Sequence, residues 1–292
     1  MDPFNSARRE LLRLGGMGLA AAAVTTVPAA YAAPRSSNPS TTLNIFDIRT
    51  YGAVGDGKAV DSPAINKAIE AAAAAGGGTV FFPAGTWLSF SIRLKNHVAL
   101  YLSQGSTLLA ADSPKPGETT GYNGGTYDAA EPKTAWDAYQ DYGHNHWHNS
   151  LLWGENIHDL SITGPGLIFG KGLSYGAGPG RPPGATPPAN PPRSPIEGAA
   201  VVRPPRGNYT MFQAEQPGVG NKAIALKNCR NVIFRDFSIL KGGHFGLLLT
   251  GVDNLTIDNL TIDTDRDGID IDCCRNVRVS NCTVNSPEDD AI

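Results

Sequence analysis

The sequence predicts an all-β fold, a right-handed parallel β-helix (a solenoid) with a short N-terminal capping helix. Two observations support this prediction. The C-terminal third repeats itself, because an asparagine followed by an apolar residue recurs at Asn231, Asn254 and Asn276, 23 and 22 residues apart. A fixed period in this range is typical of stacked structural units. The second observation is the pattern of an amphipathic helix ahead of these repeats.

Each copy of the repeat carries short segments in which apolar and polar residues alternate, as at Leu255 and Ile257, and polar turns such as Asp258-Asn259 separate them. Alternation of this kind predicts strands. Two or three short strands in about 22 residues suit one coil of a parallel β-helix, which stacks on the next coil at about 4.8 Å. Leucine-rich repeats share the period, but they require set leucines and a helix, which these copies lack.

The N-terminal part of the folded region, from residue 44, contains the expected capping helix. Ser62 is a suitable N-cap and Pro63 suits the first helical position, whereas the glycines at 76–78 end the helix. Four residues at helical spacing form one apolar stripe: Ile65, Ala68, Ile69 and Ala72. Strands are expected to follow at Thr79–Phe82, Leu88–Ile92 and Val98–Leu102.

Residues 1–33 resemble a twin-arginine-type signal peptide rather than part of the fold. The pair Arg8-Arg9 precedes the small, apolar stretch Leu14–Val27, and Ala30-Tyr31-Ala32 fits a cleavage site. A membrane anchor is the alternative, but about 14 apolar residues fall short of the ~20 that a spanning helix needs. We therefore expect a secreted or periplasmic protein with a linker at 34–43, a catalytic domain at 44–292, and no membrane partner after removal of the signal.

The composition argues against nucleic-acid binding, because 24 Lys and Arg residues stand against 27 Asp and Glu residues and the net charge is −3. An acidic sugar ligand is compatible with this total, since a local cationic groove would not show in it. We expect a monomer. The four cysteines show no metal-ligand spacing. These cysteines are Cys229, Cys273, Cys274 and Cys282. They either form disulfides, which the oxidising environment of an exported protein allows, or are buried thiols.

Two long loops interrupt the strands. Residues 171–207 are dominated by Gly and Pro and read as a low-complexity loop. Residues 112–150 carry six aromatic side chains, which either stack on sugar rings or pack beneath the loop: Tyr122, Tyr127, Trp136, Tyr139, Tyr142 and Trp147. If these loops close one end of a cleft, they would favour cleavage from a chain end.

The register of the repeat predicts a column of acidic residues on one face. A shift of 22 residues places Asp267 beneath Asp289, and a shift of 23 places His244 beneath Asp267, with Asp270 and Asp290 beside the column. Clustered carboxylates raise the proton affinity of at least one member. Glycoside cleavage uses one protonated and one ionised carboxyl, so the column suits that chemistry. A solvated row of turn aspartates, or a calcium site, is the alternative.

Three segments resemble the polygalacturonase (pectinase) family, glycoside hydrolase family 28. Residues 264–270 read Thr-Asp-Arg-Asp-Gly-Ile-Asp, where the family has Asn-Thr-Asp-Gly-Ile-Asp, so Asp265 and Arg266 depart from its pattern. Residues 289–292 read Asp-Asp-Ala-Ile and match the family's Asp-Asp-x-Ile motif. The stretch from Tyr51 to Gly85 is similar to the start of many pectinase-like β-helices and identifies the fold more than the enzyme.

The resemblance implies an inverting hydrolase of α-linked galacturonan or a related pectic polysaccharide that needs no cofactor or metal. Asp289 would be the general acid, and Asp267 and Asp290 would orient and deprotonate the attacking water. Asp270 and His244 are candidate substrate contacts. His244 matches no family motif and is chosen only for its place in the column. Stacked coils bring carboxyls closer than the ~6.5–9.5 Å usual for inverting enzymes. The family's Gly-His-Gly and Arg-x-Lys segments, which would bind the substrate carboxylate, are expected beyond Ile292 in a longer protein.

Three other functions stay open at this point. The departures at Asp265 and Arg266 could indicate a rhamnogalacturonan hydrolase. A pectate lyase on the same fold would use calcium and release unsaturated products. A non-catalytic β-helix, such as a surface adhesin, would bind sugar without cleaving it.

Overall fold

The computed structural model describes residues 44–134, 142–174, 216–287 and 289–292, and within them the chain forms three parallel β-sheets wound into a right-handed β-helix. The predicted fold class is therefore confirmed. The expected signal peptide at 1–33, the linker at 34–43, most of the loop at 171–207, and the aromatic residues Trp136 and Tyr139 lie outside the described residues, as does the side chain of Tyr142.

The sheets, here called A, B and C, have seven, seven and five strands. Sheet A contains, in spatial order, β1 (Ile45–Asp47), β3 (Gly78–Phe82), β6 (Val98–Leu102), β9 (His158–Thr163), β12 (Arg230–Arg235), β15 (Asp253–Asp258) and β18 (Arg275–Ser280). Sheet B contains β2 (Asp56–Val60), β4 (Gly85–Ser89), β7 (Ser106–Ala110), β10 (Leu167–Phe169), β13 (Ser238–Leu240), β16 (Thr261–Asp263) and β19 (Thr283–Asn285). Sheet C contains β5 (Ile92–Arg93), β8 (Leu152–Glu155), β11 (Lys222–Lys227), β14 (Phe245–Thr250) and β17 (Asp267–Asp272).

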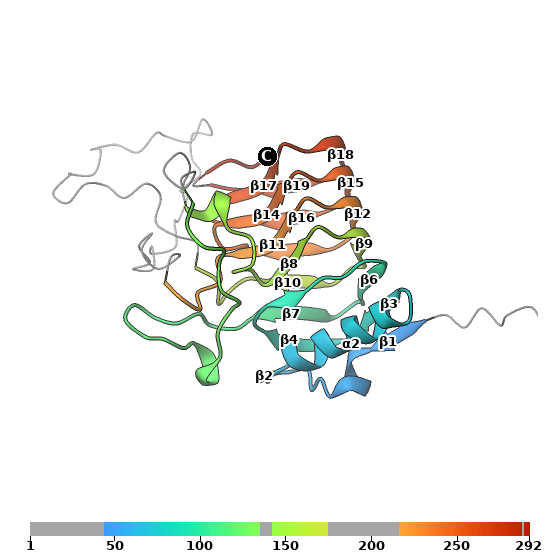
Figure 1. Cartoon of the computed structure of the whole chain (residues 1–292), viewed down its shortest axis with the longest axis vertical. Coiled ribbons are helices and arrows are strands. Elements are labelled where there is room, and N and C mark those ends of the chain that lie inside the picture. The colour runs from blue at the N-terminus through green and yellow to red at the C-terminus, as the bar shows by residue number, and fades with distance from the viewer. Residues whose placement is uncertain (1–43, 135–141, 175–215, 288) are drawn as a thin grey trace, which may run out of the picture. The chain divides into compact units, whose positions relative to one another are not determined.

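Each coil from β5 onward passes through sheet C, then sheet A, then sheet B, so three corners separate the strands. Figure 1 shows the coils stacked in chain order, with β9, β12, β15 and β18 lying side by side along one edge. Short 3₁₀ helices lie outside the coils at Ile48–Tyr51, Tyr122–Gly124 and Tyr142–Asn145. No helix in the described part of the chain is long and apolar enough to cross a membrane.

Inward-facing side chains of successive coils stack into apolar columns. In sheet A, Val232 pairs with Leu255, which pairs with Val277 of the next coil. In sheet C, Leu247 pairs with Ile269 in the same way. Four of these five side chains are fully or nearly fully buried, and the fifth, Val277, is partly buried and packs against the same core. Because burying such a side chain contributes about 1.5–3 kcal/mol, the repeated apolar pattern accounts for the stacking.

The corner between sheets C and A is held by asparagines, and we call it the amide corner. Asn231, Asn254 and Asn276 occupy it with φ of 55°, 59° and 54°. This left-handed conformation is one that asparagine tolerates better than most residues. The Nδ2 atom of Asn254 donates to Oδ1 of Asn231 at 2.9 Å, and Nδ2 of Asn231 donates to Oδ1 of Asp159 at 2.6 Å. The asparagine repeat in the sequence therefore marks a corner as well as a period.

The capping helix α2 (Ser62–Ala74) packs against the first coils at the N-terminal end of the stack (Figure 1). Its predicted apolar stripe is buried. The N-cap is Asp61 rather than the expected Ser62, and its carboxylate does not cap the helix. That carboxylate instead accepts hydrogen bonds from the backbone N–H groups of Val54 and Gly55, at 2.7 and 3.1 Å, and so fixes the glycine-rich turn.

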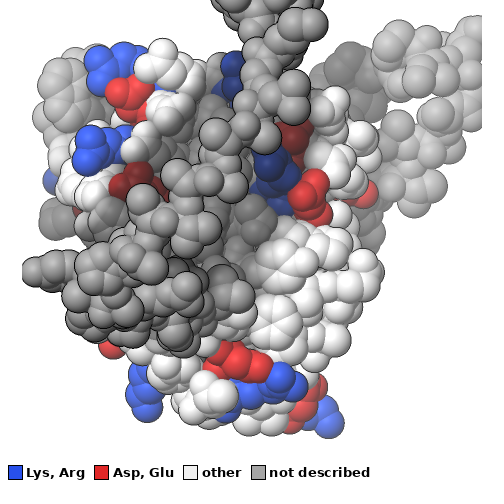
Figure 2. Space-filling model, turned by 90° about the vertical axis from the view of Figure 1, so that its right-hand side faces the viewer, with Lys and Arg blue, Asp and Glu red and all other residues white. Residues whose placement is uncertain are grey.

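The four cysteines are free thiols, so the disulfide alternative finds no support in the structure. Two of the loop aromatics pack rather than project. Tyr127 is buried edge-to-face on Phe90, and Trp147 is buried against the outer face of sheet C. On the face that Figure 2 shows, acidic and basic side chains are interspersed, with no extended basic stripe among the described residues.

Candidate active site

Three predicted site residues converge at the corner between sheets B and C, which we call the carboxylate corner. Asp267 is the first residue of β17, and Asp289 and Asp290 follow β19 in the next coil. One carboxylate oxygen from each of the three lies within 4.8 Å of the others. The 22-residue shift between these coils holds, because Asp263 pairs with Asn285 just before the corner. The predicted convergence of Asp267 with Asp289 is therefore present.

Backbone hydrogen bonds hold the two segments together. The N–H of Gly268 donates to the carbonyl of Asp290, and the N–H of Ile269 donates to that of Ala291, both at 3.0 Å. A Cβ atom on Gly268 would lie only 2.5 Å from the carbonyl oxygen of Ala291. Glycine is thus required by close approach of the chains, and this explains its place in the motif.

Asp267 is the most buried of the three carboxylates, with a relative exposure of 8%. Burial, and to a smaller extent the nearby carboxylate of Asp289, raise the pKa of Asp267 to about 6. The backbone N–H of Asp290 donates weakly to Asp267 Oδ1, at 3.3 Å. A carboxyl with this pKa is protonated in mildly acidic solution, where ordinary carboxyls are ionised.

His244 reaches Asp267 by a different route from the one expected. In the sheet register Phe245, and not His244, pairs with Asp267, so the predicted shift of 23 is wrong here. Four residues separate β13 from β14, whereas three separate β16 from β17, and this shorter corner moves the register by one. The side chain of His244 is nevertheless close, with Nε2 3.5 Å from Asp267 Oδ2, and it is 3% exposed.

Arg266 belongs to the site, although its motif position was read only as a departure from the family pattern. Its Nε and Nη2 atoms donate to Oδ2 of Asp289 at 3.0 and 2.7 Å. The arginine side chain is 7% exposed, whereas that of Asp289 is 34% exposed. A buried guanidinium beside three carboxylates offsets part of their repulsion and occupies one oxygen of Asp289.

Asp270 points outward from β17 and meets a histidine that no sequence pattern singled out. His144 Nε2 lies 3.0 Å from Asp270 Oδ2. The histidine comes from the 3₁₀ helix Tyr142–Asn145, more than a hundred positions earlier in the chain. No spacing rule joins it to β17, so only the fold brings the two together.

These residues line a pocket of about 430 Å³ at the carboxylate corner. Its walls are Asp267, Asp270, Asp289, Asp290, Arg266, His144, Ile269, Ile271 and Ile292. His244 does not line it, because its side chain lies behind Asp267. The pocket therefore combines four carboxylates with a cation and a histidine, a set suited to proton transfer.

The outer face of sheet C leads from this pocket toward β5. Its central column runs through Asp270, Leu248, Ala225 and Trp153. Residues of the covering segment 142–149 lie on this face. Trp147 packs on Leu248 and Ala225 and donates its Nε1 hydrogen to Thr250 Oγ1 at 3.0 Å. The aromatic loop thus occupies the sheet face beside the pocket.

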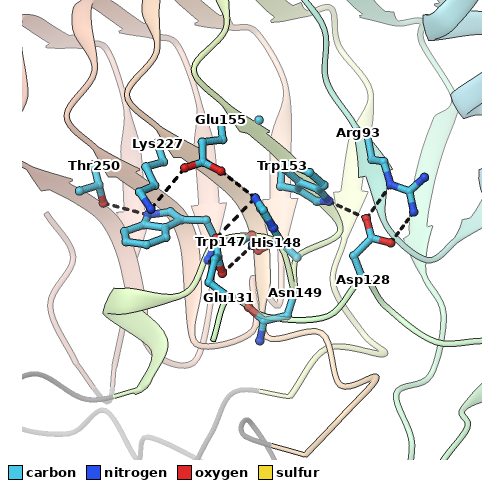
Figure 3. Close-up of polar contacts among 12 residues, drawn as sticks. Arg93, Asp128, Glu131, Trp147, His148, Asn149, Trp153, Glu155, Lys227 and Thr250 are labelled. Atoms are coloured by element: carbon cyan, nitrogen blue, oxygen red, sulfur yellow. Dashed lines mark hydrogen bonds and ion pairs between the residues drawn. The ribbon is translucent and has the colours of Figure 1, made fainter. Parts of the chain in front are cut away.

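A second polar cluster holds the covering segment in place, as Figure 3 shows. His148 Nε2 lies 3.0 Å from Oε2 of Glu155 and 3.5 Å from Oε1 of Glu131. Lys227 Nζ is 3.3 Å from Glu155 Oε1 and stands over the Trp147 ring, 4.1 Å from its centroid. Both carboxylates therefore have cationic or backbone partners, which identifies the cluster as an anchor for the segment.

The carboxylate corner also has the donor set of a hard cation site. Asp267, Asp289 and Asp290 each offer an oxygen, and calcium prefers oxygen ligands in groups of six to eight. Arg266 already supplies a positive charge at Asp289. Three carboxylates plus backbone and water oxygens would be needed to complete such a site.

Two family models match the chain. Residues 45–127 match "Rhamnogalacturonase A/epimerase, pectate lyase-like", and residues 207–292 match "Right handed beta helix region". The first covers the capping helix and early coils. The second covers the repeats and both aspartate motifs.

Known relatives fall into more than one functional class. An exo-poly-alpha-D-galacturonosidase of Dickeya chrysanthemi is 36% identical over 96 residues, which are 30% of this chain and 16% of that protein. A mannuronan C5-epimerase of Azotobacter vinelandii is 50% identical over 52 residues, 18% of this chain and 3% of that protein. The chain thus spans only a small part of the curated relatives that it matches.

Among solved structures, a family 28 exopolygalacturonase of Yersinia enterocolitica superposes with a TM-score of 0.56 at 21% identity. The match covers 83% of this chain and 43% of that one. At this identity the likeness is one of fold. Together with the second family model, it supports a right-handed β-helix for the coils.

Proposed function

We propose that this chain, a pectate-lyase-like right-handed β-helix of the family 28 polygalacturonase kind, hydrolyses α-linked galacturonan or a related pectic polysaccharide. Its N-terminal segment would direct export to where that polymer lies. The observation that carries the proposal is the carboxylate corner, where three carboxylate oxygens from two adjacent coils converge within 4.8 Å.

The corner divides its carboxyls into two protonation states. Asp267, with a pKa of about 6, retains a proton at the mildly acidic pH at which exposed carboxyls are ionised. Hydrolysis of a glycoside needs this division, because one group protonates the leaving oxygen while another activates water. Burial of one carboxyl beside two exposed ones therefore supports a hydrolase over a passive row of turn aspartates.

We assign the acid role to Asp267, which exchanges the roles that the family resemblance implies. Two hydrogen bonds from Arg266 occupy Oδ2 of Asp289, whereas burial raises the pKa of Asp267 to about 6, so Asp267 is the carboxyl better suited to supply the proton. Asp267 would protonate the glycosidic oxygen, and Asp290 would take a proton from the attacking water. Asp289, fixed by Arg266, would hold that water. The bond from water to the anomeric carbon forms as the glycosidic bond breaks.

Inversion stays the expected stereochemistry, although the oxygens lie closer than the ~6.5–9.5 Å that separates carboxyls in inverting enzymes. Asp290 is exposed, and rotation of its side chain would widen its distance from Asp267 when substrate enters. Proton NMR of the first product anomer decides the point. An α product formed from an α-linked polymer would contradict inversion.

The decisive experiment is product analysis on polygalacturonate with chelator present, for the wild type and for Asp267→Asn, Asp289→Asn and Asp290→Asn. Hydrolysis predicts new reducing ends without ultraviolet-absorbing unsaturated ends, lost in the variants. If the wild type acts only on rhamnogalacturonan, the substrate assignment is wrong and the mechanism stands. Binding without products, unchanged in all three variants, would indicate a sugar-binding protein instead.

A calcium-dependent lyase is the second candidate, because the same three oxygens form the beginning of a cation site. It predicts unsaturated products that disappear with chelator and return with calcium. The buried guanidinium of Arg266 favours hydrolysis, since it already neutralises part of the charge that would attract the ion.

The covering segment favours attack from a chain end, because Trp147 and His148 occupy the face of sheet C beside the pocket. Short products released one unit at a time from the start of the reaction would support this mode. A Trp147→Ala variant that yields the same product lengths would argue against the segment as its cause.

A further inference from the structure

We propose that the amide corner carries a binding site for a divalent transition metal of the zinc class, formed by His97, His158 and Asp159. The Nδ1 atoms of His158 and His97 lie 2.8 and 3.3 Å from the same oxygen, Oδ2 of Asp159. The three ligand atoms all lie within 4.8 Å of one another. Two imidazole nitrogens and one carboxylate oxygen are a ligand set that zinc uses.

The geometry is close to that of a tetrahedral site. With metal–ligand distances of about 2.0–2.1 Å, neighbouring ligands of a tetrahedral zinc lie about 3.3 Å apart. The two nitrogen–oxygen distances of 2.8 and 3.3 Å are near this value. The imidazole rings lie edge to face with centroids 4.8 Å apart, so their nitrogens approach one carboxylate from two directions. One tetrahedral position is left for water.

The site interrupts the asparagine ladder of the amide corner. Ala99 pairs with Ser161, so His97 and Asp159 hold the same position in adjacent coils, and both have the left-handed backbone of the ladder, with φ of 60° and 56°. In the following coils Asn231 and Asn254 occupy this position and hydrogen-bond to each other. Asparagine alone therefore satisfies this position, and the turn itself gives no reason for the imidazole of His97. His158 holds the position before it, which Arg230 and Asp253 occupy in the following coils.

Outer contacts orient the ligands. Nδ2 of Asn231 donates to Oδ1 of Asp159 at 2.6 Å, which turns Oδ2 toward the imidazoles. The backbone N–H of His158 donates to Oδ1 of Asn96 at 2.8 Å, and the N–H of His97 donates to the carbonyl of His158 at 3.2 Å. Hydrogen-bonded ligands of this kind are typical of metal sites, where the outer partner fixes the orientation of the ligand.

The other histidine cluster offers a contrast within the same chain. At the covering segment, Lys227 pairs with Glu155, and backbone N–H groups of Trp147 and His148 donate to Oε2 of Glu131. At the amide corner no lysine or arginine ion pair to Asp159 is found among the described residues. The side chains there are exposed, by 50% for His97, 28% for His158 and 41% for Asp159. An ion from solution can reach them without a change of fold.

A bound ion would join the coil of β5 and β6 to the coil of β8 and β9 at the surface. This site lies at the opposite end of the sheet C strands from the carboxylate corner. Along sheet C it is at β8 and β5, three and four strands away from β17. It is thus separate from the proposed hydrolysis and independent of it.

The test is calorimetric titration of the untagged full chain with zinc chloride. We expect one zinc per chain, with affinity reduced at least about tenfold in His97→Asn, His158→Gln and Asp159→Asn, since loss of outer partners alone typically costs 10–100-fold. Asn replaces His97 and Asp159 because both have a left-handed backbone, which asparagine tolerates. Gln replaces His158, whose backbone is not left-handed. His148→Gln is the matched control and should bind as the wild type does.

Thermal unfolding supplies a second readout, because a ligand that binds only the folded state raises the melting temperature. Zinc should raise it for the wild type and His148→Gln but not for His158→Gln. The proposal is overturned if the wild type shows no saturable binding, if the corner variants bind as tightly as the wild type, or if His148→Gln removes the affinity. Activity on polygalacturonate is measured with chelator present, so the test of the proposed hydrolysis does not depend on the result of the zinc test.

Discussion

The strands of sheet C run between two corners of opposite chemistry. At the amide corner, asparagines stack in successive coils, and Asn231 both accepts a hydrogen bond from Asn254 and donates one to Asp159. At the carboxylate corner, ionised aspartates can only accept hydrogen bonds, so a proton on Asp267 and the guanidinium beside Asp289 each stabilise the stack. The same coil geometry thus gives a structural ladder at one end and a reactive cluster at the other.

The largest expected effect comes from turning the carboxylate corner into an amide one with Asp267→Asn. Loss of the acid should reduce the rate on polygalacturonate by about 10²–10⁴-fold, measured as new reducing ends. The same variant should be more stable at pH 7, by up to about 3 kcal/mol, because a pKa raised by roughly two units is a cost of that size when the group is ionised.

The sign of this stability effect follows from proton binding. The folded protein holds a proton on Asp267 up to about pH 6, whereas the unfolded chain loses it near the ordinary value of 3.8. Wild-type stability therefore falls as pH rises through this window and is level above it. Urea unfolding at pH 4 and pH 7 should show the gain of Asp267→Asn at pH 7 only. A gain of equal size at both pH values would contradict the raised pKa.

Arg266→Thr, which restores the family residue, sharpens the comparison by removing the cation from the carboxylate corner. The charge of Arg266 lowers the pKa of Asp267, against the larger effects of burial and Asp289. Without it that pKa rises, so the activity that depends on protonated Asp267 should extend to higher pH. Stability should fall by about 1–3 kcal/mol as Asp289 loses its partner.

The control for this change is Arg266→Lys, which keeps the charge and should shift the pH–rate profile less. If the profile stays in place in Arg266→Thr and the alkaline limb is lost in Asp289→Asn instead, the acid role returns to Asp289.

Asn254→Asp is the reverse exchange, a carboxylate placed in the amide corner. It removes the hydrogen bond to Asn231 and adds a negative charge next to Asp253. We expect a loss of about 1 kcal/mol at pH 7, measured by urea unfolding, and a smaller loss at pH 3, where the new carboxyl is protonated. Asn254→Gly, which tolerates the backbone but carries no charge, should lose stability equally at both pH values.

The smallest effect is expected for His144→Gln, which removes one contact to Asp270 at the pocket wall. If that contact helps to position substrate, KM should rise about 2–10-fold with kcat little changed, as for one hydrogen bond. An unchanged KM would limit His144 to holding the covering segment.

The fold could be predicted because its signal is local and repeated: an apolar alternation, an asparagine turn and a fixed period. The convergence of Asp267 and Asp289 followed from the same period. The register of His244 could not be predicted from this period. The corner between β16 and β17 is one residue shorter than that between β13 and β14, which shifts the pairing of β17 and leaves no mark in the apolar pattern.

The contact of His144 with Asp270 and the packing of Trp147 could not be predicted from the sequence for another reason. Both lie on a segment outside the repeat that returns to the outer face of sheet C, and no periodicity relates its residues to the strands that it covers. Arg266 was visible in the motif, but its partner became clear only when the next coil placed Asp289 above it.

The asparagine ladder also has a polarity. Each Nδ2 hydrogen points toward the preceding coil, from Asn254 to Asn231 and from Asn231 to Asp159. Side-chain dipoles aligned in this way add up along the stack, as peptide dipoles do along a helix. The end that collects the hydrogens favours a negative group, and the residue found there is a carboxylate. A row of neutral amides can therefore act as a weak directional field along the solenoid axis, with Asp159 as its terminus.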